Sequence, residues 1–108
     1  MAGLIRLNEN QAWSVPGWIF DHVLRVSRPY IRKADSSTIV ELMDKAETGL
    51  NYISLEKLSP KEMKILREAL ESAYQELATR GADSFGDPDF YPGFMKSFEE
   101  LLEMVPRN

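Results

Sequence analysis

The chain has 108 residues, of which 44% are hydrophobic and 28% are charged, and its net charge at pH 7 is −4. This length and composition predict a single globular domain over residues 1–108 and exclude a disordered chain. The sequence has no cysteine, which excludes disulfides, thiolate metal sites and thiol catalysis.

No apolar run reaches the roughly 20 residues that span a bilayer, and residues 1–10 lack the pattern of a signal peptide. The sequence therefore predicts a cytoplasmic protein without membrane contact. The charge is unevenly distributed, since residues 1–35 have a net charge of +2 and residues 36–108 one of −6. An acidic surface repels the phosphates of nucleic acids and attracts basic proteins. Ordinary solubility also explains this charge.

The first helix is predicted over residues 16–33. Residues 1–12 have too few apolar positions to define an element, so they predict an extended or loosely held arm. From there, apolar residues recur at helical spacing, and a cluster of aromatic residues widens the same face. These residues are Val15, Ile19, Val23, Val26 and Tyr30, with Trp13, Trp18 and Phe20 beside them. Pro29 lacks a backbone N–H, which predicts a kink before the last turn.

A second helix is predicted over residues 37–50, because Ile39, Met43, Ala46 and Leu50 share one helical face. Residues 51–57 alternate between apolar and polar, as a β-strand does. A single strand without a partner is not stable, so this segment is predicted to be a loop or one helical turn.

The central element is a helix predicted over residues 60–80. Ser59 and Glu62 have the spacing of a capping box, Pro60 suits the first helical position, and Gly81 suits the end. Leu66 and Leu70 lie on its apolar face and are expected in the core.

Residues 82–93 are rich in Gly, Asp and Pro and contain Phe85, Phe90 and Tyr91, which predicts a structured loop. A last helix follows over residues 92–105, with an apolar stripe that includes Phe94 and Phe98. The four helical segments together predict an all-α, single-domain bundle around the helix of residues 60–80.

Residues that could carry chemistry are few. His22 is the one histidine, and a zinc site would need further nitrogen or sulfur ligands. Asp83, Asp87 and Asp89 are spaced aspartates, but position 94 of the chain is Phe94, where a calcium-binding EF-hand would need a glutamate. The chain has no phosphate-binding loop and no nucleophile elbow. The sequence therefore predicts a protein that is not an enzyme and has no metal or cofactor.

An alternative function comes from Arg25, Arg28 and Arg32, which would form a basic stripe on the first helix. Such a stripe could contact DNA phosphates in a helical regulatory module. The neighbouring residues are not of the kind that reads bases, and the arginines could equally pair with acidic side chains of this chain.

The C-terminal segment combines aromatic rings with acids, as the core and rim of a protein interface do. The same rings could instead be part of the hydrophobic core. The residues predicted to contact a partner are Asp87, Asp89, Tyr91, Glu99 and Glu103. A structural domain that forms homo-oligomers through these aromatics is a further alternative.

The run from Asp87 to Leu102, DPDFYPGFMKSFEELL, is one of four features that carry a resemblance. With the size, the lack of cysteine and the helical pattern, the chain resembles the small acidic immunity proteins of bacterial toxin systems, including contact-dependent growth inhibition. The resemblance implies that the partner is a cognate toxin domain, often a basic nuclease, which is blocked by direct binding.

Overall fold

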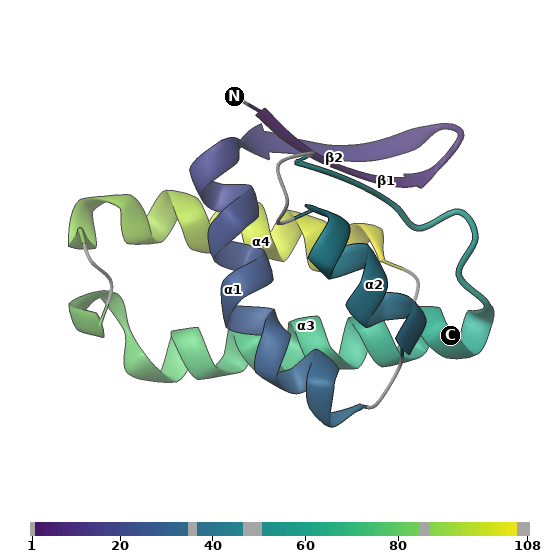
Figure 1. Cartoon of the computed structure of the whole chain (residues 1–108). Coiled ribbons are helices and arrows are strands. Elements are labelled where there is room, and N and C mark those ends of the chain that lie inside the picture. Colours follow the sequence, from purple (N-terminus) through teal and green to yellow (C-terminus); the bar gives the residue numbers. More distant parts are fainter. Residues whose placement is uncertain (1, 35–36, 47–50, 85–86, 106–108) are drawn as a thin grey trace.

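The computed structural model describes residues 2–34, 37–46, 51–84 and 87–105. The elements in chain order are β1 (Ala2–Asn8), β2 (Gln11–Pro16), α1 (Gly17–Lys33), α2 (Ser37–Lys45), β3 (Tyr52–Ser54), α3 (Pro60–Arg80), the 3-10 turns η2 (Ala82–Ser84) and η3 (Pro88–Phe90), and α4 (Tyr91–Met104). Helices α3 and α4 lie side by side, α1 crosses them, and the strands lie at one edge of the helical layer (Figure 1).

The predicted all-α bundle is wrong, because the described residues also contain a three-stranded sheet in the order β2-β1-β3. The fold is therefore α+β. Strand β1 pairs antiparallel with β2 and parallel with β3, so that Ile5 lies between Trp13 and Ile53. The residues predicted to be a loose N-terminal arm form β1 and the start of β2. Burial alternates along β1, where Gly3, Ile5 and Leu7 face the core.

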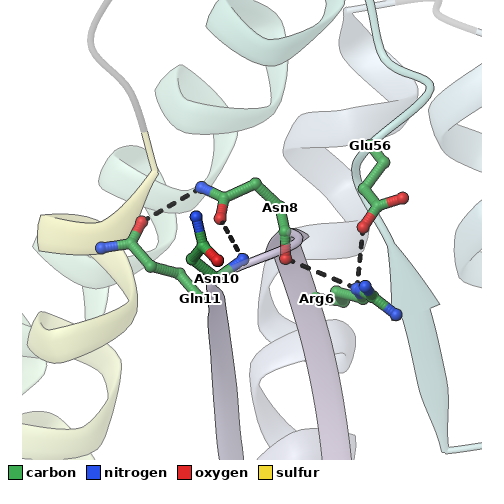
Figure 2. A network of polar contacts seen from close by, with 5 residues as sticks. All are labelled: Arg6, Asn8, Asn10, Gln11 and Glu56. Carbon is green, nitrogen blue, oxygen red and sulfur yellow. Dashed lines mark hydrogen bonds and ion pairs between the residues drawn. The ribbon is translucent and has the colours of Figure 1, made fainter.

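The hairpin between β1 and β2 is closed by polar side chains (Figure 2). The Asn8 Oδ1 accepts a hydrogen bond of 2.8 Å from the Asn10 backbone N–H, and the Asn8 amide lies 3.3 Å from the Gln11 side-chain oxygen. An asparagine that bonds to the backbone two residues later stabilises a turn. Beside the turn, Arg6 forms an ion pair of 2.7 Å with Glu56, which ties β1 to the segment after β3.

The inner face of the sheet packs against α1 and α4. A Cβ atom at Gly3 would lie 2.2 Å from the Cβ of Phe20, so only glycine allows α1 to approach the strand this closely. The indole N–H of Trp13 donates a 2.8 Å hydrogen bond to the carbonyl oxygen of Ser97 in α4. Trp13 thus belongs to the sheet, although the sequence placed it beside the face of the first helix.

Helix α1 confirms the helix predicted over residues 16–33 to within one residue at its start, and it continues through Pro29. Helix α2 ends at Lys45, and residues 47–50 of the predicted second helix lie outside the described residues. The segment predicted to be a loop or helical turn contains β3 instead. Its partner is β1, which lies far away in the sequence, so local patterns could not reveal the pairing.

The helix predicted over residues 60–80 is confirmed as α3. The Ser59 side chain accepts a hydrogen bond from the Glu62 backbone, and the Glu62 carboxylate accepts one from the Ser59 backbone, which completes the capping box. Leu66 and Leu70 are buried, as predicted. Helix α4 begins one residue before the predicted start and ends one residue before the predicted end.

Candidate protein-binding surface

The five residues predicted to contact a partner lie along α4 and the turn before it. Asp87 and Asp89 are exposed in and beside η3, whereas Glu99 and Glu103 are exposed on α4. Tyr91 begins the helix and is half-buried. At about 1.5 Å per residue, Tyr91 and Glu103 are separated by about 18 Å along the helix. The structure therefore divides the predicted site into two ends.

Two of these side chains have structural contacts of their own. The Asp87 Oδ1 accepts a 3.1 Å hydrogen bond from the backbone N–H of Asp89 and thereby caps η3. The Tyr91 hydroxyl donates to the carbonyl oxygen of Leu77 at 3.1 Å, which attaches the start of α4 to the end of α3. The turn is thus held in a defined position relative to both helices.

The structure answers whether the C-terminal aromatics are core or surface. Phe94 and Phe98 are fully buried, and their rings meet edge to face with centroids 6.0 Å apart. Phe90, in contrast, is 55% exposed. Phe85 lies outside the described residues. The aromatic cluster therefore contains both a core part and an exposed part.

The exposed part includes a residue that the sequence did not assign to the site. Trp18 in the first turn of α1 is 45% exposed, and its ring lies 5.5 Å from that of Phe90. It also stacks on Phe94, with centroids 6.2 Å apart. We call Trp18 and Phe90 the aromatic pair. The sequence analysis placed Trp18 beside the apolar face of the first helix, but its ring remains largely exposed.

A groove of about 630 Å³ runs between α3 and α4. Its lining is formed by Glu68, Glu71, Ser72, Tyr74, Gln75 and Leu102. Burial is the main cause that raises the pKa of Tyr74, and the negative charge of Glu99 raises it further. Glu99 therefore lies close enough to add its charge to this side of the molecule. Glu71 is paired with Arg67 at 2.7 Å, which offsets part of the negative charge.

The arginine stripe is partly engaged within the chain. Arg28 forms an ion pair of 3.1 Å with Asp44 of α2, while Arg25 and Arg32 are exposed. This contact favours the alternative in which the stripe pairs with acids of the same chain.

His22 is half-buried, and its ring lies 4.8 Å from that of Phe94 in an edge-on arrangement. Burial, and secondarily the charge of Arg25, lowers the pKa of His22. Within the described ranges, no three His, Asp or Glu side chains are grouped so that they could hold a metal ion. In the same part of the chain, no helix has the length and apolar character needed to cross a membrane.

Comparison with known proteins shows a likeness of fold. No protein-family model matches the chain, and no curated protein matches it in sequence. A similar fold occurs in the solved structure of a CdiA-CT toxin from Burkholderia pseudomallei E479 in complex with its cognate CdiI immunity protein. The TM-score is 0.66 at 18% sequence identity, and the match covers 98% of this chain and 95% of that chain. The likeness is therefore one of fold over nearly the whole length.

Proposed function

We propose that this chain is a non-enzymatic immunity protein that binds a cognate bacterial toxin domain and blocks it by direct contact. The observation that carries this proposal is the fold shared, over 98% of the chain, with a structure of a toxin bound to its immunity protein. The resemblance inferred from the sequence points to the same class of protein, and the shared fold supports it.

The charge of the chain supports a basic partner. Residues 36–108 have a net charge of −6, against +2 for residues 1–35, and the described acids of the C-terminal segment are exposed around η3 and along α4. Opposite charges on two proteins increase their rate of association, and buried aromatic contacts slow dissociation. A toxin domain that binds nucleic acid would present the basic surface that this requires.

The proposed contact residues are Asp87, Asp89, Tyr91, Glu99 and Glu103. Because they lie at two ends of α4, they are separable by mutation. The carboxylates of Asp87 and Asp89 are beside the exposed Phe90, whereas Glu99 is near the groove between α3 and α4. A partner of ordinary interface size, about 800 Å² on each side, would cover one end and reach toward the other.

Co-expression tests the proposed function. The probe is the C-terminal domain of the toxin protein encoded by the neighbouring gene, since an immunity gene ordinarily lies next to its toxin gene. We expect this domain to arrest growth of a host cell, the intact chain to restore growth, and the two purified proteins to elute as one complex. Continued growth arrest in the presence of folded chain, with no complex, would overturn the proposal.

Charge reversal tests the proposed contact residues. Reversal of both Asp89 and Glu103 to lysine is expected to slow association with the toxin domain at low salt, because the attractive field is lost at both ends. The matched control reverses Glu9 and Glu41, which are exposed on the hairpin and on α2. If both folded double variants bind as fast as the wild type, the acidic C-terminal surface is not the interface.

A further inference from the structure

The aromatic pair is exposed in a fold that buries most of its large apolar side chains. Among the described residues, Trp18, Tyr52 and Phe90 are the large hydrophobic side chains that remain exposed. Trp18 and Phe90 lie against each other although they come from α1 and η3. Contiguous exposed rings are typical of binding sites, since tryptophan and other aromatic residues supply much of the energy of protein interfaces.

The pair rests on a rigid base. Trp18 is stacked at 29° on Phe94, which is fully buried and packs edge-on against both His22 and Phe98. On the other side, Phe90 precedes Tyr91, whose hydroxyl is bonded to α3. The two exposed rings are therefore held in position before any partner arrives, which reduces the entropy lost on binding.

The charged residues that neighbour the aromatic pair in the sequence favour the binding of a cation. Asp89 directly precedes Phe90, and Asp87 belongs to the same turn. Asp21 follows Trp18 by three residues and is therefore on the same side of α1, where it is exposed. Arg25 lies a further turn away and offsets part of this charge. These four residues carry three negative charges and one positive charge, so the segments that supply the two rings have a net negative charge.

We infer that the aromatic pair is the anchor point for an arginine side chain of the basic protein partner. The guanidinium would stack on the face of Trp18 or Phe90 and pair with the carboxylate of Asp89. Arginine suits this arrangement because its planar, weakly hydrated cation both stacks on rings and forms paired hydrogen bonds to carboxylates. This inference rests on the proposed function, and it places the binding energy at the η3 end of α4.

Fluorine NMR of the chain labelled with 5-fluorotryptophan locates the contact directly. The chain has two tryptophans, of which Trp13 is 2% exposed and Trp18 is 45% exposed. The Trp18→Phe variant assigns the two signals. When unlabelled toxin domain is added, we expect the Trp18 signal to shift and to lose its sensitivity to solvent, while the Trp13 signal changes little. An unchanged Trp18 signal in a formed complex would show that the pair is not the anchor.

Substitutions of Phe90 test the chemistry of the occupant. Phe90→Leu keeps an apolar side chain but removes the aromatic face, and it is expected to weaken toxin binding by about three- to thirtyfold. Tyr52→Leu is the matched control, because Tyr52 is a comparably exposed ring in β3; its effect should stay within about twofold. If Phe90→Leu binds as tightly as the wild type while Phe90→Ala binds weakly, the occupant is an apolar side chain and the inference is wrong.

The role of the Asp89 carboxylate and the proposed function are tested separately. Asp89→Asn removes one charge and nearly preserves shape, so weaker binding of this variant supports a paired cation. If the wild-type chain itself neither binds nor neutralises the toxin domain, the proposed function fails before any variant is made. If the wild type binds and the variants at Trp18, Asp89 and Phe90 bind equally well, only the anchor assignment fails.

Discussion

Arg67 of α3 donates a hydrogen bond from Nη1 to the main-chain carbonyl oxygen of Val105, 2.5 Å away and 38 residues further along the chain. The same nitrogen donates to the carbonyl oxygen of Leu102, and the Nε pairs with Glu71 at 2.7 Å. The last carbonyl groups of a helix have no donor within the helix. The buried guanidinium supplies one, and it attaches the end of α4 to the middle of α3.

Arg67→Ala is therefore expected to lower the free energy of unfolding by about 3 kcal/mol, because buried carbonyl groups lose a charged donor and a cavity is left. Chemical denaturation provides the measurement. Arg80→Ala is the control, since Arg80 also has an i,i+4 partner in α3, Glu76 at 2.9 Å, but is exposed. Its cost should be at most about 0.5 kcal/mol. A loss of stability for Arg67→Ala as small as that for Arg80→Ala would show that the contact between α3 and the end of α4 is unimportant for stability.

The contact of Gly3 with Phe20 leads to a second prediction. Gly3→Ala places a methyl group within 2.2 Å of the Phe20 Cβ, so strand and helix must separate. We expect a loss of about 1 to 3 kcal/mol, as for other overpacked sites. Gly93→Ala in the first turn of α4 meets nothing within 4 Å and should be neutral or slightly stabilising. Thermal unfolding, monitored by circular dichroism, distinguishes these outcomes. A Gly3→Ala protein as stable as the wild type would contradict the close packing of Gly3 against Phe20.

The helices were predictable because their signals are local. The capping box at Ser59, the proline after it and Gly81 all act within one turn of the helix that they limit, and α3 has the predicted bounds. The sheet was not predictable in the same way. Residues Glu9 and Asn10 form the hairpin turn without a glycine, so the usual hairpin signal is missing. Strand β3 has only three residues, and its partner is distant in sequence.

The candidate site was likewise predictable from the sequence only in part. Sequence spacing identified the acids of the last helix and the aromatic residues beside them, but it could not decide which rings are buried. Phe94 and Phe98 are core, whereas Phe90 is exposed. Trp18 was missed because its neighbour in space, Phe90, is 72 residues away and is brought to it by the packing of α1 against α4. Tertiary packing, which no local pattern encodes, determines this pair.

The capping box provides a third prediction. Ser59→Ala removes the side-chain oxygen that accepts from the Glu62 backbone at 3.1 Å. The expected cost is about 0.5 to 2 kcal/mol, measured by denaturant unfolding. Ser59→Asn supplies another capping oxygen and should restore most of the stability. A Ser59→Ala variant as stable as the wild type would mean that packing of α3, rather than its cap, determines where the helix begins.

His22 gives a prediction about pH. Folding lowers its pKa, because burial disfavours the imidazolium and Arg25 repels it. The unfolded chain binds the proton near the ordinary pKa of 6.5, whereas the folded chain binds it only at lower pH. The contribution of His22 to stability is therefore complete above pH 6.5 and is lost as the pH falls through the lowered pKa. Glu62 also has a lowered pKa, but the contribution of Glu62 to stability changes with pH only below its ordinary pKa of 4.5.

The measurement compares unfolding at about pH 7.5 and about pH 5.5, a range in which histidine is the side chain that normally titrates. The wild type should be less stable at the lower pH, and His22→Gln should lose less stability over the same interval. Arg25→Gln should raise the pKa of His22 toward its ordinary value, because one of the two causes of the shift is removed. The single histidine makes this pKa directly readable from its ring-proton NMR signal. A measured pKa at or above 6.5 in the folded wild type would contradict the burial of His22 against Phe94.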